Sequence, residues 1–186
     1  KKITRPVGPV YIMLYKPDAV VSTASDPEGR KTVLDCVSHE SRLYPVGRLD
    51  YDTTGALILT NDGEFANMMM HPSNNIDKVY VAKIKGILLP NEIMSLKNGV
   101  LLDGVKTSRA KVKVKKIDKE SNTSIVEITI HEGKNHQVKR MFEAVDKEVL
   151  KLKRERIAFL DLRGLNSGEY RKLSHKEVSK LYVLAK

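Results

Sequence analysis

Short segments of alternating apolar and polar residues recur along this 186-residue chain. The alternation is clearest in two neighbouring segments joined by the turn-forming residues KESN, where Val112 and Val114 in the first match Val126 and Ile128 in the second. Lysines occupy the alternate positions of the first segment. Because successive side chains of a strand point to opposite faces, the pattern predicts an antiparallel hairpin with one apolar face.

The same patterns predict the other elements. Strands are predicted over residues 10–15, 20–23, 56–61, 78–86, 110–117, 123–133 and 148–162. Helices are predicted over residues 31–40, 63–71, 91–99 and 135–145, and from Ser174, which forms a capping box with Glu177. The strands do not alternate strictly with helices, so we expect an α+β fold with a mainly antiparallel sheet.

The charge balance adds the first indication of function. The chain has 33 Lys and Arg residues against 23 Asp and Glu residues, a formal net charge of +10. A basic protein suits a polyanionic partner, although a solvated basic surface would give the same count. No apolar run approaches the roughly 20 residues of a membrane span, and the single cysteine, Cys36, cannot form an internal disulfide. We therefore expect a soluble, cytoplasmic, monomeric protein with no membrane association.

The segment GRLDYDTTG (47–55) holds the first candidate site. Its two glycines bracket residues that favour turns, so Asp50 and Asp52 are predicted to lie on a rigid loop just before a strand. Such a loop can present a carboxylate to a cleft, and we assign that role to Asp50. Asp52 is predicted only to cap backbone amides of the turn, together with the neighbouring threonine hydroxyls.

A rival pattern covers the same residues. Asp50, Asp52 and Thr54 match the DxDx[TV] pattern of haloacid dehalogenase-like phosphatases, in which the first aspartate is the nucleophile and magnesium is required. That pattern should follow a buried apolar strand, whereas Pro45 and Arg48 precede it here. A later pair of acidic residues for magnesium and a regular βαβ alternation are also missing from the sequence.

The segment HEGKNHQVKRMFEAV (131–145) is the second candidate site. If this segment is a helix, its apolar residues form a stripe on one face, and the other face carries His136, Lys139, Arg140 and Glu143. Such a basic face can hold phosphates or pair with a carboxylate, although a solvated helix face is the simpler alternative. His136 has no second histidine or cysteine nearby, so we expect no metal site. Tyr80, in KVYVAKIKG (78–86), is either a core residue or a ring that stacks on a base.

Taken together, these segments resemble the bacterial ribosomal RNA pseudouridine synthases. The resemblance covers essentially the whole chain and keeps the family's motif order: YKPDAVVST (15–23), YPVGRLDYDTTGALILTNDGEFAN (44–67), KVYVAKIKG (78–86) and EGKNHQVKRMFEA (132–144). GRLDxDTxG is highly specific. Ala19 stands where the family usually has glycine, and Lys139 where many members have arginine. KTVLDCV and AFLDLRGLNSGEYRKLS are most similar to the members that modify the large subunit.

The resemblance implies a fold and a site. It implies the family's catalytic fold, a curved, mainly antiparallel mixed sheet flanked by helices with a central active-site cleft, as one catalytic domain over residues 1–186. An S4-like RNA-binding domain usually precedes it in the family, and we expect this sequence to hold the catalytic part alone. The implied catalytic residues are Asp50 as the carboxylate nucleophile, Tyr80 stacked on the base, and Lys139 paired with Asp50.

Four further residues would contact RNA by the same resemblance. Arg48 would enter the space left by the flipped uridine, and phosphates would be contacted by Lys16, Lys134 and Arg140. The expected substrate is ribosomal RNA, with the large subunit favoured over the small subunit, and no cofactor or metal is implied. Whether Asp50 attacks the sugar or assists an elimination is left open, and a non-catalytic RNA-binding module is the remaining alternative.

Overall fold

The computed structural model of the chain describes residues 8–38 and 42–185. Its strands are β1 (Tyr11–Lys16), β2 (Tyr44–Val46), β3 (Thr53–Thr60), β4 (Lys78–Lys85), β5 (Leu101–Leu102), β6 (Val105–Lys106), β7 (Lys111–Asp118), β8 (Thr123–Ile130), β9 (Glu148–Ile157), β10 (Leu160–Asp161) and β11 (Tyr170–Lys172). Its helices are α1 (Gly63–Met70), α2 (Pro90–Asn98), α3 (Gln137–Glu143) and α4 (His175–Leu184), with 3₁₀ turns η1 (Val33–Cys36) and η2 (Pro72–Asn74).

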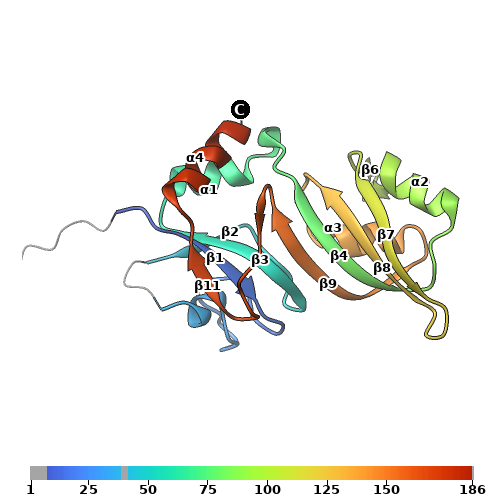
Figure 1. The fold of residues 1–186 in the computed structure, drawn as a ribbon, viewed down its shortest axis with the longest axis horizontal. Coiled ribbons are helices and arrows are strands. Elements are labelled where there is room, and N and C mark those ends of the chain that lie inside the picture. Colours follow the sequence, from blue (N-terminus) through green and yellow to red (C-terminus); the bar gives the residue numbers. More distant parts are fainter. Residues whose placement is uncertain (1–7, 39–41, 186) are drawn as a thin grey trace, which may run out of the picture.

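One twisted sheet runs through the molecule (Figure 1). Its strand order is β11-β1-β3-β9-β4-β8-β7, with β2 beside β3 and β10 beside β9, while β5 and β6 form a separate hairpin. Within the described residues, β3 and β9 pair in parallel and the other strand pairs are antiparallel. The predicted α+β fold with a mainly antiparallel mixed sheet is confirmed, and so is the β7–β8 hairpin.

A glycine permits the parallel junction between β3 and β9. Gly55 pairs with Arg154 and has a φ of +114°, and a Cβ there would lie 2.0 Å from the Arg154 carbonyl oxygen. Because only glycine lacks that atom, the two strands can approach closely at this point. The pairing begins at Thr53, three residues after Asp50, so the junction fixes the Asp50 loop beside β9.

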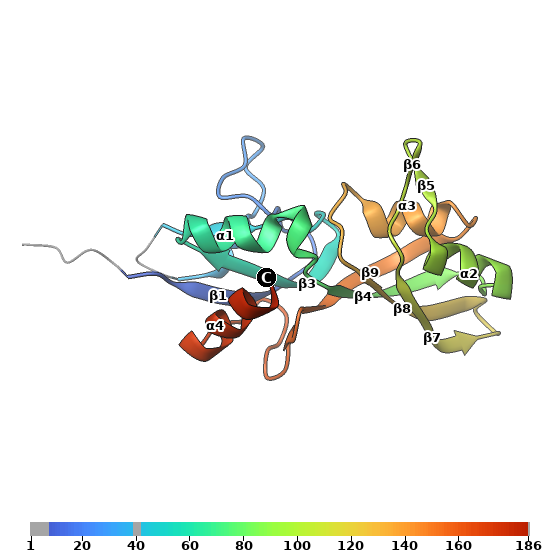
Figure 2. The same ribbon diagram turned by 90° about the horizontal axis from the view of Figure 1, so that it is seen from above.

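Apolar clusters attach the helices to the sheet. One cluster holds Phe65 of α1 and Leu181 of α4, and another holds Met141 and Phe142 of α3 together with Leu96 of α2. The apolar stripe predicted for residues 135–145 is buried in the second cluster. Figure 2 shows α3 lying along one side of β4 and β9. None of the helices in the described part of the chain is both long and apolar enough to cross a bilayer.

Some predicted elements differ from the observed ones. The helix expected over residues 31–40 is a single 3₁₀ turn, and residues 39 and 40 lie outside the described part. The strand expected over 20–23 is an isolated bridge from Val21 to Thr32. Its apolar Val20 packs in one cluster with residues of β1 and β3, and the segment does not pair along its length with another strand. The missed strands β2, β5, β6 and β11 have two or three residues each, too few to show periodicity.

The capping box at Ser174 leads to a prediction for acid stability. The Arg171 guanidinium donates two hydrogen bonds of 2.9 Å to Glu177, and this pairing lowers the pKa of that carboxyl from 4.5 to about 2. A lowered pKa stabilises the fold above pH 4.5, and the stabilisation disappears as pH falls towards 2. Because the pair is partly exposed, we expect Glu177→Gln to reduce the free energy of unfolding by about 1 kcal/mol at pH 7.

Urea denaturation across pH 2 to 7 checks this expectation. The difference between the wild type and Glu177→Gln should shrink between about pH 4.5 and pH 2, the range set by the two pKa values. A difference that stayed constant over that range would show that the carboxylate charge does not stabilise the link between β11 and α4.

Candidate active site

A cleft of about 700 Å³ opens where the loop before β3, strands β4 and β9, and the segment entering α3 meet. Five residues predicted from the sequence line it: Arg48, Asp50, Tyr80, Lys134 and Lys139. They come from segments far apart in the chain, and the fold brings them to one place. The predicted central cleft is therefore present, and its lining is rich in basic residues.

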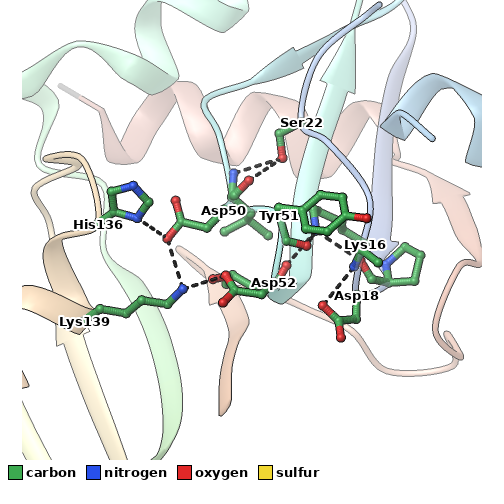
Figure 3. Close-up of polar contacts among 12 residues, drawn as sticks. Lys16, Asp18, Ser22, Asp50, Tyr51, Asp52, His136 and Lys139 are labelled. Atoms are coloured by element: carbon green, nitrogen blue, oxygen red, sulfur yellow. Dashed lines mark hydrogen bonds and ion pairs between the residues drawn. The ribbon is translucent and has the colours of Figure 1, made fainter. Parts of the chain in front are cut away.

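Asp50 and Lys139 form an ion pair in this cleft (Figure 3). The Lys139 ammonium lies 3.6 Å from Asp50 Oδ2, and both side chains are about a quarter exposed, at 23% and 24%. The same ammonium donates a 2.6 Å hydrogen bond to Asp52 Oδ1, which lowers the pKa of the Asp52 carboxyl below its usual value. The prediction that Asp52 only caps the turn is thus wrong, because Lys139 reaches both carboxylates.

His136 is a second partner of Asp50, a pairing that the sequence did not indicate. Its Nδ1 lies 2.9 Å from Asp50 Oδ2, in position to donate a hydrogen bond. His136 precedes α3 and has a left-handed backbone with φ of 51°, so it is not on the helical face that periodicity assigned to it. No pattern in the sequence marks this turn. Asp50 Oδ2 therefore lies close to nitrogen atoms from both His136 and Lys139.

Lys16 does not lie where the sequence analysis placed it. Its side chain is fully buried, and its ammonium donates hydrogen bonds to the carbonyl oxygens of Pro17, Tyr51 and Thr53 at 3.0, 3.2 and 2.8 Å. Burial lowers the pKa of Lys16 to about 8. The prediction of a phosphate contact is wrong, because all three donors are directed at backbone groups inside the protein.

The segment around Lys16 instead holds the Asp50 loop in place. The Ser22 hydroxyl donates to the Leu49 carbonyl at 2.8 Å and accepts from the Leu49 amide at 3.1 Å. The Ala19 amide donates to the Tyr51 carbonyl at 3.0 Å, with Ala19 itself at a positive φ of 60°. Ala19, which stands where the resemblance suggests a glycine, therefore adopts the left-handed turn itself. Contacts from this segment fix the backbone on both sides of Asp50.

Replacing Lys16 with methionine should destabilise the fold. The substitution keeps an unbranched side chain of similar length but leaves three carbonyl oxygens without their shared donor, one of them in a buried contact. We expect a loss of about 1 to 3 kcal/mol in the free energy of unfolding, measured by urea denaturation. Lys134→Met, at a partly exposed lysine, is the matched control and should change stability little. Equal losses in the two variants would contradict the buried role of Lys16.

The floor of the cleft carries two further cations that sequence patterns did not single out. Arg154 of β9 is buried, donates to the Ala56 carbonyl at 2.8 Å, and lies 3.4 Å from the Tyr80 hydroxyl through Nη1. Lys78, two residues before Tyr80, also lines the cleft, and its burial together with the charge of Arg154 lowers its pKa to about 8. Alternation would place Lys78 beside Tyr80, but only the fold shows that Arg154 joins them.

The remaining predicted contacts lie at the rim or outside it. Arg48 is exposed, and Lys134 lies 4.0 Å from Glu132. Arg140 is not among the residues that line the cleft and pairs with Asp103, in the β5–β6 turn, at 2.7 Å. Its predicted phosphate contact stays a prediction. Across residues 8–38 and 42–185, no cluster of three or more His, Cys, Asp and Glu side chains is arranged to hold a metal ion.

Comparisons with known proteins identify this combination of sheet and cleft. A crystal structure described as a pseudouridylate synthase superposes with a TM-score of 0.82 at 34% identity, covering 94% of this chain and 74% of that one. A human protein, RNA pseudouridylate synthase domain containing 1, shares the fold with a TM-score of 0.60 at 13% identity, covering 88% and 78%. The fold and the cleft around Asp50 thus define an enzyme of the pseudouridine synthase class.

The chain belongs to the RNA pseudouridylate synthase family, which it matches over residues 10–144. It is 55% identical to the ribosomal large subunit pseudouridine synthase B of Bacillus subtilis, over 95% of this chain and 73% of that protein. It is 37% identical to a dual-specificity RNA pseudouridine synthase of Escherichia coli, over 94% and 58%. The phosphatase alternative is wrong, because the chain matches the RNA pseudouridylate synthase family and the mainly antiparallel sheet of its described residues lacks a regular βαβ alternation.

Proposed function

We propose that the protein converts a specific uridine of large-subunit ribosomal RNA to pseudouridine, with Asp50 as the catalytic carboxylate. The observation that carries this proposal is the position of Asp50, held in the cleft within 3.6 Å of Lys139 and 2.9 Å of His136. The large subunit is favoured because the 55% identical Bacillus subtilis relative is named for it. A small-subunit uridine is the alternative substrate.

The reaction needs little beyond a positioned carboxylate. The bond from the ribose C1′ to N1 of uracil breaks, the base rotates, and C1′ rejoins it at C5, which loses a proton while N1 gains one. No other covalent bond differs between substrate and product. Carboxylates suit this task because they can attack or stabilise an electron-poor C1′. Direct attack by Asp50 and elimination to a glycal both remain compatible with the geometry of the cleft.

The neighbouring residues would prepare the site. Lys139 would hold the Asp50 carboxylate in place through the 3.6 Å ion pair. The uridine must leave its stack to enter the cleft, and Arg48, an exposed residue that lines the cleft, would occupy the space it leaves. The ring of Tyr80 lines the cleft and can stack on the flipped base. Lys134 and Arg140 would contact phosphates nearby.

Carbodiimide mapping of pseudouridines tests this function. Transcripts of large-subunit and small-subunit ribosomal RNA are incubated with the protein, and modified positions are read as stops of reverse transcription. We expect one new stop in the large-subunit transcript. A new stop in the small-subunit transcript alone would reassign the substrate. No new stop in either, with RNA bound, would favour the non-catalytic RNA-binding module.

Tyr80→Phe separates two possible roles of the tyrosine. The variant keeps the ring and removes the hydroxyl, which lies next to Arg154 in the structure. The hydroxyl is the group through which Tyr80 can transfer a proton. We therefore expect its removal to lower kcat about 10²-fold with little change in KM. Single-turnover and steady-state measurements check this. Near-normal kcat would assign Tyr80 to stacking alone, and Tyr80→Ala, which also removes the ring, should raise KM as well.

A further inference from the structure

One face of the sheet is left open to solvent on the side away from the cleft. Tyr80, Ile128 and Leu152 point towards the cleft and the cluster under α2 and α3, so the alternate residues of their strands point the other way. Figure 2 shows no helix on that other side of β4, β8 and β7. Six lysines lie on this side: Lys83 of β4, Lys111, Lys113 and Lys116 of β7, and Lys151 and Lys153 of β9. We call the surface that they form the lysine face.

Strand register places these lysines close together. Lys83 stands directly opposite Lys151 of β9 on one side and opposite Ile125 of β8 on the other. Ile125 in turn stands opposite Lys116 of β7. Lys113 stands opposite Glu127, the carboxylate that β8 contributes to this face. Like charges in directly opposed cross-strand positions destabilise a sheet. The Lys83–Lys151 pair therefore costs stability in the free protein, and a bound anion would offset that cost.

The positive charge of this face is not neutralised by the protein. Within the described residues, none of the six lysines has a carboxylate within ion-pair distance. Four of them are exposed, and Lys83 and Lys153 are partly exposed. Glu127 stands among the six lysines, and the next row of the same face adds Lys85 with Glu148 and Asp118. Cations therefore outnumber carboxylates on the paired positions of this face, and the potential over it is positive.

A hollow of about 520 Å³ continues the lysine face past β9. Lys153, Arg156 and Arg163 line it, together with the ring of Tyr15, over which the Lys153 ammonium lies at 4.9 Å. Carboxylates from Glu127, Glu155 and Asp161 also line the hollow, and Asp161 pairs with Arg163. Cations beside an aromatic ring are the groups that bind single-stranded nucleic acid, through phosphates and stacked bases.

We propose that the lysine face binds the sugar-phosphate backbone of a second segment of the RNA whose uridine occupies the cleft. This inference rests on the proposed function for the identity of the polyanion. Lysines act as point charges without the bidentate geometry that reads bases, so the contacts would strengthen binding without selecting a sequence. Because the face and the cleft lie on opposite sides of the sheet, only an RNA long enough to pass around an edge can reach both.

A triple substitution tests the proposal: Lys111, Lys113 and Lys151 are each changed to Gln. Its matched control changes Lys97, Lys176 and Lys180 to Gln, which removes the same amount of charge. These three lysines are exposed and lie on α2 and α4. The probes are a large-subunit ribosomal RNA transcript and the shortest fragment of it that the wild type modifies. We expect the slope of log affinity against log salt for the transcript to fall by about 2 to 3 units in the test variant.

The comparison of probes gives each outcome a meaning. Support requires at least tenfold weaker binding to the transcript, unchanged modification of the short fragment, and no comparable loss in the control variant. Equal losses in the test and control variants would overturn the proposal, as would an equal loss on both probes. If the wild type formed no pseudouridine at all, the proposed function would fail, while binding to the transcript would still report on the lysine face.

Chemical acetylation of the unaltered protein gives a second measurement that needs no folded variant. Lysines are acetylated with and without the transcript, and the modified positions are read by mass spectrometry. Protection of Lys111, Lys113 and Lys151 by RNA supports the proposal, whereas protection confined to Lys134 and Lys139 of the cleft overturns it. Vesicles of anionic lipid are the competing polyanion. Protection by vesicles and not by RNA would assign the lysine face to a membrane surface and refute RNA as its ligand.

Discussion

Asp50→Asn is expected to abolish pseudouridine formation while RNA binding is retained. The asparagine side chain has nearly the same shape as aspartate but carries no charge and is not a nucleophile. In enzymes that lose a nucleophile or its charged partner, kcat falls by roughly 10⁴-fold or more, and we expect a loss of that size here. Release of tritium from C5-labelled uridine in the large-subunit transcript measures the rate, and filter binding measures the affinity.

The structure supplies a close control in Asp52→Asn. Asp50 and Asp52 lie on the same loop and contact the same Lys139 ammonium, at 3.6 and 2.6 Å. Asp52, however, is 68% exposed and is not among the residues lining the cleft. Asp52→Asn should therefore keep most of the activity. Wild-type activity in Asp50→Asn would refute the proposed mechanism, and loss of activity only in Asp52→Asn would transfer the catalytic role to Asp52.

Lys139→Ala is the second substitution with a large expected effect. It removes the ammonium that lies between Asp50 and Asp52 and leaves two carboxylates close together without their shared cation. We expect kcat/KM to fall by about 10² to 10³-fold, the usual effect of removing one charge-stabilising donor from an active site. Thermal stability should change little, because the pair is partly exposed and such pairs contribute about 1 kcal/mol or less.

Lys139→Arg is the matched variant, because it keeps the positive charge. It should recover a large part of the activity, measured by the same tritium release. Lys139→Met, which keeps most of the side-chain bulk without the charge, should behave like Lys139→Ala. If the methionine variant were as active as the arginine variant, packing and not charge would explain the role of Lys139.

Secondary structure was predicted well wherever local signals are strong. Alternation at β7 and β8 gave the hairpin and its apolar face, and the stripe on α3 gave the buried side of that helix. The capping box at Ser174 marked the start of α4, with Glu177 bonded back to the Ser174 amide. The predictions for segments 20–23 and 31–40 were wrong, because their apolar residues are buried as irregular segments against β1 and β3. Apolar residues alone do not distinguish such a segment from a strand or a helix.

The candidate site was predicted through its motifs, and its partners were only partly predicted. Asp50, Tyr80 and Lys139 were assigned from the sequence, and the fold brings all three to one cleft. His136 and Arg154 were not assigned to the site, because a left-handed turn directs the first to Asp50 and strand pairing carries the second to Tyr80. Such contacts join residues 74 to 86 positions apart, a separation at which no local periodicity operates.

The sequence by itself determined which residues alternate, where helices begin and which family the motifs belong to, because these depend on local geometry and residue chemistry. Only the tertiary structure decided what each charged side chain meets. Lys16 is buried against backbone carbonyls, Lys139 pairs with two carboxylates, and Lys83 and Lys151 face each other on an uncovered sheet. The energy of a charge depends on its solvation and on its neighbours in space, and both are set by the packing of distant segments.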